Sequence, residues 1–264
     1  QGRRSDVIVA TKVGLAPPSH SGVLRAALPL ARRVLSWVPR RVRDALRDTA
    51  AQSGATEAAR GRFSVEKVRE SLETSLRKLR TDYVDVLLLH ECRPEDVGEE
   101  LVAFLDRCVR EEKVRYYGLA TDVEACTQIL DAHPTFRVAQ FENNVRMPGM
   151  ESFSASQDVS PVTHSPLGRS LRLIPRLTDH AKKNPGVAQK WAAHTGLDLR
   201  APGNVARVLL SYALRQNKRG VVLCGMFNLH HLAANVGTTD HPVANEALAE
   251  VVQSMRTVLT DEQL

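Results

Sequence analysis

The sequence predicts an α/β protein built on parallel strands, and two observations indicate this fold class. The segment 82–90 is an apolar run that ends in His90, which is typical of a strand buried on both faces of a parallel sheet. Segments with strand and helix patterns alternate along the whole chain, which implies right-handed parallel crossovers. A second predicted strand ends in Lys12, so Lys12 and His90 are expected at one rim, where (β/α) barrels have their chemistry.

The expected strands are short segments rich in aliphatic side chains, and the expected helices show apolar residues at a spacing of three or four. The strands cover residues 6–12, 83–90, 114–120, 137–142, 162–165 and 220–225. The clearest helix covers residues 65–79, after Ser64 as a good N-cap. The other helices cover residues 98–110, 123–131 (after Asp122), 184–194, 204–215, 228–235 and 243–259.

Composition bounds the class of protein. The chain has 264 residues, 43% hydrophobic and 25% charged, which is typical of a soluble globular protein of one large or two small domains. No stretch of about 18 apolar residues occurs, so no membrane span is expected. The four cysteines have no C-x-x-C spacing and are interpreted as reduced thiols of a cytoplasmic protein.

Positive charge is concentrated in an Arg-rich segment, residues 18–62, within a chain of net charge +6. Such a segment is compatible with binding to nucleic acid or to a membrane surface. Pro29 and Pro39 interrupt any long amphipathic helix, which favours an inserted loop with a solvated Arg face. No nucleic-acid partner is therefore expected.

Five motifs resemble one known family when they are read in order along the chain. They are Ala10 to Gly14 ("a-T-K-v-G"), the specific stretch 71–90 with its "D-Y-i-D" and "l-l-H", 113–118 ("G-K-v-r-x-i-G"), 164–168 ("y-S-P-L-g") and 222–235. Together they resemble aldo-keto reductases, and the Arg-rich segment resembles longer loops of the sugar-dehydrogenase-like branch. The resemblance implies one (β/α)8 barrel domain over residues 1–264. It also implies hydride transfer between NADP or NAD and a small carbonyl or alcohol substrate.

The catalytic set of the family is Asp, Tyr, Lys and His, and by resemblance Lys12 and His90 are its Lys and His. The family's "D-T-A-x-x-Y-G" segment, which carries the Asp and the Tyr, does not occur in these residues. Tyr83, Tyr116, Tyr117 and Tyr212 all lie early in strands or within a helix, so none is expected to be the proton donor. His90 is an alternative proton donor, because histidine titrates near neutral pH.

About six strands are expected, so the first two barrel strands are missing from this sequence. An N-terminal truncation is the favoured explanation, since Gln1 is not a native start. A short paralogue closed by a partner and a different closure of the remaining strands are the alternatives. Exposed strand edges would favour a homo-oligomer.

Nine residues match cofactor contacts of the family. Gln140 matches the partner of the nicotinamide carboxamide, Thr121 retains a hydroxyl after its strand, and His164 replaces a stacking tyrosine. Ser165 and Leu167 match residues around the pyrophosphate. The adenosine side is matched by Gly225, Asn228, His231 and Asn235. The segment 228–235 carries no Arg or Lys for a 2′-phosphate, so NADP and NAD stay open, with a tilt away from a strong NADP preference.

Two functions are carried forward from the sequence. The first is an NAD(P)-dependent oxidoreductase that interconverts carbonyl and alcohol. The second is a catalytically impaired nucleotide-binding or scaffold protein that lacks the tyrosine acid. No metal site is expected, because His90 and Cys92 have no further ligand nearby in sequence.

Overall fold

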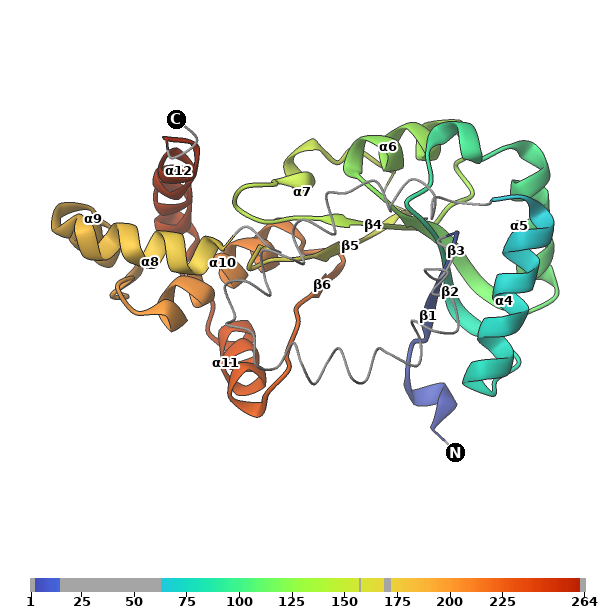
Figure 1. Ribbon diagram of the computed structural model, residues 1–264, viewed down its shortest axis with the longest axis horizontal. Coiled ribbons are helices and arrows are strands. Elements are labelled where there is room, and N and C mark those ends of the chain that lie inside the picture. Colours follow the sequence, from blue (N-terminus) through green and yellow to red (C-terminus); the bar gives the residue numbers. More distant parts are fainter. Residues whose placement is uncertain (1–2, 15–62, 157, 169–171, 262–264) are drawn as a thin grey trace, which may run out of the picture. The chain divides into compact units, whose positions relative to one another are not determined.

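The computed structural model describes residues 3–14, 63–156, 158–168 and 172–261 (Figure 1). The Arg-rich segment predicted at 18–62 lies outside these described residues. The chain divides into two compact units, Gln1–Ala120 and Thr121–Leu264. Each unit contributes three parallel strands, so the six predicted strands are present and the α/β fold class is confirmed.

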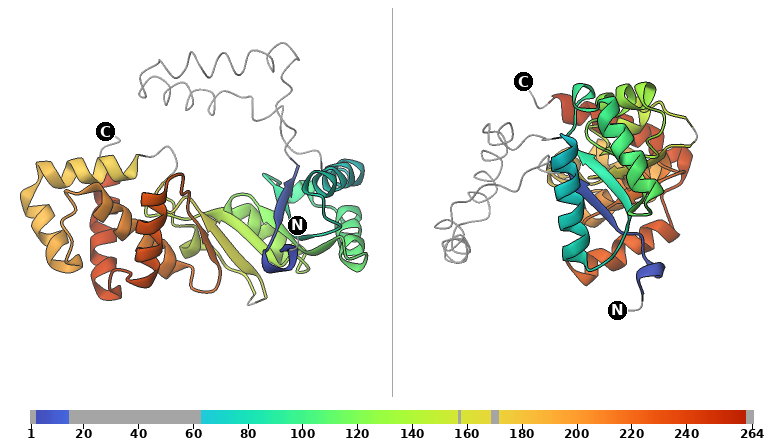
Figure 2. Two further views of the ribbon diagram at one scale, coloured as in Figure 1. Left: turned by 90° about the horizontal axis from the view of Figure 1, so that it is seen from below. Right: turned by 90° about the vertical axis from the view of Figure 1, so that its right-hand side faces the viewer.

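The first unit is a three-stranded parallel sheet covered by two helices on one face (Figures 1 and 2). Its strands are β1 (Ala10–Val13), β2 (Val84–His90) and β3 (Val114–Ala120), with β2 in the middle. The helices are α4 (Val65–Leu79) and α5 (Glu99–Arg110), and two single-turn 3-10 helices, Arg4–Asp6 and Pro94–Asp96, precede β1 and α5.

Alternation along the strands decides which side chains enter the core of this unit. Leu87 and Leu89 of β2 are fully buried, as is Val68 of α4. Thr11 of β1 lies on the helix-facing side, since its hydroxyl donates to Ser75 Oγ of α4 at 3.3 Å. The apolar residues of α4, α5 and the sheet therefore form one aliphatic core, as expected from the small number of aromatic residues.

Asp85 anchors the N-terminal end of the first sheet. Its carboxylate is only 4% exposed and accepts the Val9 N–H at 2.8 Å. It also pairs with Arg4 at 2.8 Å and Arg115 at 2.9 Å, and both guanidiniums lie over the Tyr83 ring. Burial alone would raise the pKa of Asp85, but the hydrogen bond from Val9 and the two arginines outweigh it and lower that pKa.

The second unit combines a three-stranded parallel sheet with a helical core. Its strands are β4 (Val138–Glu142), β5 (Ser160–His164) and β6 (Val221–Leu223). Its helices are α6 (Val123–Ala132), α7 (Gly149–Ser152), α8 (Leu173–Lys183), α9 (Pro185–Thr195), α10 (Pro202–Gln216), α11 (Leu229–Asp240) and α12 (Asn245–Asp261).

Helices α8, α9, α10 and α12 pack around one buried cluster that includes Leu177, Trp191, Leu209 and Met255. Trp191 is 1% exposed and its indole N–H donates to Ser254 Oγ at 3.0 Å, so its single polar atom is satisfied. This cluster gives α10 a fixed support from which its outer face can take part in binding.

Most predicted elements agree with the structure, and the differences have local causes. The strand predicted at 6–12 begins only at Ala10, because Asp85 binds the Val9 N–H through its side chain. The helix predicted at 228–235 continues to Asp240, and α8 was not predicted. Its N-cap residue, Arg172, has a left-handed backbone and makes no side-chain cap, so no start signal was present in the sequence.

The N-cap predictions had mixed outcomes. Asp122 caps α6 by accepting the Ala125 N–H at 2.8 Å. Ser64 precedes α4 in an extended conformation but makes no side-chain cap hydrogen bond. All four cysteines are free, and burial raises the pKa of the Cys126 thiol to about 12. Among the helices of the described residues, none is both long and apolar enough to cross a membrane.

The Asp85 network yields a stability prediction. We expect Asp85→Asn to lower the free energy of unfolding by about 2 kcal/mol or more, because two arginines and the Val9 amide lose a charged partner. Since the pKa of Asp85 is lowered on folding, this contribution is present above the unfolded pKa of about 3.9 and is lost as pH falls below it.

Urea unfolding of the full chain at pH 7 and at about pH 3.5 measures this contribution. The difference between wild type and variant should be smaller at the lower pH. The exposed Asp82, changed to Asn, is the matched control and should leave unfolding unchanged. An equal effect of both substitutions at pH 7 would contradict the role given to Asp85.

Candidate functional site

Lys12 and His90 project from the same face of the first sheet. Lys12 is in register with Leu88, two residues before His90, and parallel neighbours point to the same side. Thr11 and Leu87 point to the opposite, helix-covered side. The structure therefore places Lys12 and His90 at the C-terminal end of adjacent strands, on the face that α4 and α5 leave uncovered.

Two features shape the rim around His90. Glu91 follows it with a left-handed backbone (φ 58°), which is uncommon for a residue with a side chain and is a feature of functional sites. Its amide donates to the Ala120 carbonyl at 2.9 Å, and its carboxylate lies 4.0 Å from His90 Nε2. On β1, a Cβ at Gly14 would overlap the Phe63 ring, so Phe63 packs directly against this rim.

Each of the four tyrosines has a place away from this rim. Tyr83 lies between Arg4 and Arg115 at the other end of β2, and Tyr117 is buried and donates to Asp106 at 2.6 Å. Tyr116 is in register with Val86, two pairs below His90. The Tyr212 hydroxyl donates to Glu151 and accepts from Arg256 (Tyr212 Oη to Arg256 Nη2, 2.7 Å). Burial raises the pKa of Tyr212, which opposes a role in proton transfer.

In the second unit, Gln140 and His164 share one face of the sheet. Gln140 pairs with Val162 and Glu142 pairs with His164, so all four side chains point to the same side. The opposite side carries Thr163, which accepts a hydrogen bond from Asn217 Nδ2 beyond the end of α10. Gln140, which is 7% exposed, therefore does not lie on the helix-covered side, as a purely structural strand glutamine would.

Ser165 occupies a tight turn after β5. Its backbone is left-handed (φ 58°), its carbonyl accepts the Gly168 N–H at 2.9 Å, and its hydroxyl lies 3.0 Å from His164 Nδ1. The predicted residue Thr121 lies elsewhere in the unit. It precedes α6, is 8% exposed, and its hydroxyl donates weakly to Asp122 Oδ2 at 3.5 Å.

Asn144 is a positioning residue that sequence reasoning missed. It is fully buried, and its amide donates to Glu142 Oε1 at 2.9 Å and to the Ser165 carbonyl at 3.3 Å. Its side-chain oxygen accepts the amides of Arg146 and Met147, each at 3.0 Å. Asn144 thus ties the end of β4 to the Ser165 turn, and only a buried polar pattern seen in three dimensions reveals it.

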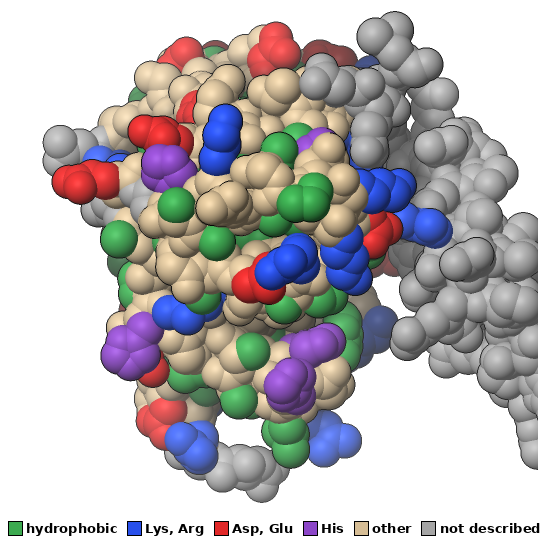
Figure 3. Space-filling view, turned by 90° about the vertical axis from the view of Figure 1, so that its left-hand side faces the viewer, with side chains coloured by type: hydrophobic (Ala, Val, Ile, Leu, Met, Phe, Trp, Pro, Cys, Tyr) green, Lys and Arg blue, Asp and Glu red, His purple; other side chains and the backbone are tan. Residues whose placement is uncertain are grey.

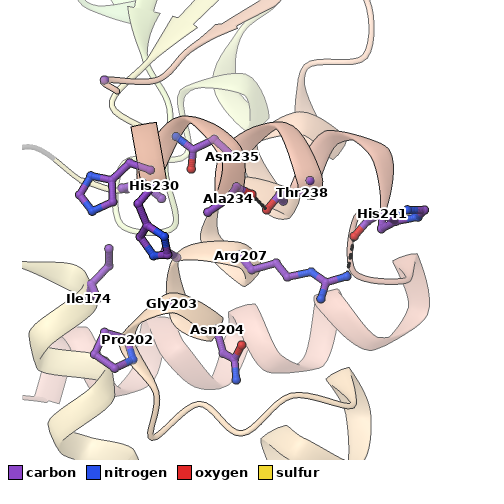
Figure 4. Close-up of a pocket in the computed structure, with 15 residues that line it drawn as sticks. Ile174, Pro202, Gly203, Asn204, Arg207, His230, Ala234, Asn235, Thr238 and His241 are labelled. Atoms are coloured by element: carbon purple, nitrogen blue, oxygen red, sulfur yellow. Dashed lines mark hydrogen bonds between the residues drawn. The ribbon is translucent and has the colours of Figure 1, made fainter. Parts of the chain in front are cut away.

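A pocket of about 690 Å³ lies between α10 and α11, within the range of sizes that ligands occupy (Figure 4). Leu167, Gly225, His231 and Asn235, four of the residues predicted to hold the cofactor, line it together. Asn228 does not line the pocket but caps α11, where its Oδ1 accepts the His231 N–H at 2.8 Å. Gln140, Thr121, His164 and Ser165 are not among the lining residues.

The pocket also contains residues that were not predicted. Arg207 reaches it from α10, and its Nη2 donates to the His241 carbonyl at 2.7 Å (Figure 4). Asn204, at the start of α10, and His230 and His241, from the two ends of α11, complete its polar lining. The prediction that α11 carries no Arg or Lys holds, but a cation comes from the neighbouring helix.

The surroundings of the pocket carry mixed charge. On the face shown in Figure 3, acidic and basic side chains are interspersed and form no broad single-sign patch. That face lacks the basic stripe that nucleic acid requires. Among the described residues, no group of three or more His, Cys, Asp or Glu side chains is arranged to hold a metal ion.

Comparison with known proteins identifies the same family along nearly the whole chain. The family model "Aldo/keto reductase family" matches residues 1–256. Curated relatives include aldo-keto reductase str7 of Strobilurus tenacellus, 24% identical over 70% of this chain and 61% of that protein. L-galactose dehydrogenase of Arabidopsis thaliana is 24% identical over 66% of this chain and 58% of that protein. The chain thus spans about 60% of the length of the curated relatives it matches.

Solved structures show the same fold. Aldo-keto reductase AKR11C1 from Bacillus halodurans, in its holo form, superposes with a TM-score of 0.64 at 18% identity, over 96% of this chain and 74% of that one. A putative aldo-keto reductase from a Pseudomonas species gives 0.54 at 19% identity, over 94% and 69%. The predicted (β/α)8 type of fold, represented here by six strands, is therefore confirmed.

The buried Asn144 gives the prediction for this site. We expect Asn144→Ala to lower the free energy of unfolding by about 2 kcal/mol or more, because it removes four hydrogen bonds and leaves two amides and a carbonyl unpaired. Thermal unfolding measures the change. Asn184→Ala is the control, since Asn184 is exposed and makes one local bond to His180. Equal midpoints for the two variants would show that Asn144 does not hold the turn.

Proposed function

Because this chain belongs to the aldo/keto reductase family, we propose that it is an NAD(P)-dependent oxidoreductase. Its substrate is a small aldehyde, ketone or sugar, which it interconverts with the corresponding alcohol. The observation that carries the proposal is the placement of Lys12 and His90 on one uncovered face, at the C-terminal ends of β1 and β2. This is the end of the strands where barrel enzymes bind their substrates.

Lys12 and His90 have complementary roles in this proposal. The ammonium group of Lys12 lowers the pKa of a neighbouring proton donor, because a cation stabilises its ionised form. The imidazole of His90 binds the carbonyl oxygen and orients it. Glu91, 4.0 Å from His90 Nε2, stabilises the ring when it carries a second proton.

The second unit has the groups that a nicotinamide dinucleotide needs. Gln140 offers an amide for the nicotinamide carboxamide, and His164, which shares its face of the sheet, offers a ring for stacking. The Ser165 turn, with Leu167, is assigned to the pyrophosphate. The pocket fits an adenosine group, because it is concave and largely apolar, with a few polar side chains from α10 and α11. When bound, the cofactor supplies or accepts the hydride.

A second candidate is a nucleotide-binding protein without turnover. Its supporting observation is that, within residues 3–14 and 63–120, no tyrosine lies at the Lys12 end of the sheet. The assignment of Thr121 to the cofactor, a cytoplasmic location and a homo-oligomer formed through strand edges also remain predictions.

Turnover separates the two candidates. We expect the full chain to oxidise NADPH or NADH in the presence of at least one member of a panel of aldehydes, ketones and sugars. Lys12→Met should lower kcat on the order of a hundredfold or more, since it removes the group that tunes the proton donor. Lys78→Met, on the exposed side of α4, is the matched control and should retain activity.

Binding of NADPH or NADH by the wild type without turnover on any substrate would favour the second candidate. Quenching of nicotinamide fluorescence detects that binding independently of catalysis. Equal activity of Lys12→Met and wild type would remove Lys12 from the mechanism.

A further inference from the structure

The geometry of the pocket points to Arg207 as the residue that selects the cofactor. We propose that its guanidinium binds the 2′-phosphate of NADP(H), so that the protein prefers the phosphorylated dinucleotide. This inference rests on the proposed function, and it assigns specificity to α10 rather than to the α11 segment where the sequence offered no cation.

Arg207 has donors to spare. Its Nη2 donates to the His241 carbonyl at 2.7 Å, whereas its Nε is buried and has no partner among the described residues. A guanidinium has five N–H donors in a planar fork. Within the part of the chain that the structure describes, no carboxylate pairs with Arg207. Its one neutral partner, a carbonyl, leaves the positive charge uncompensated.

The rest of the pocket lining is free of negative charge. No Asp or Glu is present among the fifteen residues drawn in Figure 4, and Arg207 is their single Lys or Arg. The three lining histidines, His230, His231 and His241, come from the two ends of α11 and its C-cap. An anion in this pocket therefore meets a permanent cation at α10 and no acidic competitor.

Hydrogen bonding keeps His231 neutral. Asn228 Oδ1 accepts the His231 backbone N–H at 2.8 Å, which fixes the orientation of the Asn228 amide. The Asn228 amide nitrogen then faces His231 Nδ1 at 3.2 Å, so Nδ1 must accept that hydrogen bond. The proton of the ring consequently lies on Nε2. His231 thus offers a neutral donor to the ligand, and the fixed charge comes from Arg207.

The chemistry of the two cofactor forms makes the choice. A 2′-phosphate is a compact anion whose oxygens match the planar fork of a guanidinium, and such charge-assisted pairs are the stronger hydrogen bonds. A 2′-hydroxyl leaves the spare N–H groups of Arg207 without an anionic partner. The competing explanation is that Arg207 only caps the end of α11 through the His241 carbonyl. That structural role would affect stability and would not discriminate between the two cofactors.

The test measures binding of NADPH and NADH to the full chain, together with the fragments 2′,5′-ADP and 5′-AMP. We expect wild type to bind NADPH and 2′,5′-ADP at least about tenfold more tightly than NADH and 5′-AMP. Arg207→Gln should weaken NADPH on the order of tenfold and change NADH less than about twofold. Arg207→Lys should be intermediate. Arg200→Gln, an exposed arginine paired with Asp198, is the matched control.

Each outcome decides between the explanations. Equal affinity of wild type for NADPH and NADH, or an equal loss of both in Arg207→Gln, overturns the inference and leaves the proposed function in place. Binding of neither dinucleotide overturns the proposed function and this inference with it. If Arg207→Gln does not fold, the comparison of 2′,5′-ADP with 5′-AMP on wild type and Arg207→Lys still decides, because both proteins retain the cation.

Discussion

Each sheet buries one face against its own helices, and this constraint organises the candidate site. In the first unit, Thr11, Leu87 and Leu89 face α4 and α5, so the alternating residues Lys12 and His90 must point to the other side. In the second unit, the same alternation places Gln140 and His164 opposite Thr163. The apolar helix-facing residues therefore determine where the polar residues point. A one-residue shift in register would move all of them to the wrong side.

Buried polar side chains hold the ends of these sheets where regular hydrogen bonding stops. Asp85 binds the chain at Val9 before β1 begins, and Asn144 connects the end of β4 to the Ser165 turn. Asn217 does the same for β5 and β6, with one amide group shared among Pro161, Thr163 and Val221. Such groups are expensive to bury without partners, so their complete pairing indicates that these turns have one defined conformation.

Family membership and local geometry support different parts of the functional argument. The family match covers residues 1–256 and establishes the kind of protein. Sequence identities near 24% with the curated relatives leave substrate and cofactor choice to the residues of this chain. The pocket between α10 and α11 is where that choice can be examined, because its fixed charge comes from one side chain, Arg207. The rim with Lys12 and His90 is where turnover can be examined.

The sequence by itself determined the strand positions and the polar residues at their ends, because buried apolar runs and alternation are local patterns. It also carried the motifs that resemble the family. Only the tertiary structure decided which polar residues meet. Arg207 contacts His241, 34 residues later, through the packing of α10 on α11, and no spacing rule along the chain connects them. Asn144 and the face on which Gln140 lies were equally invisible, since burial and register arise from contacts between segments distant in sequence.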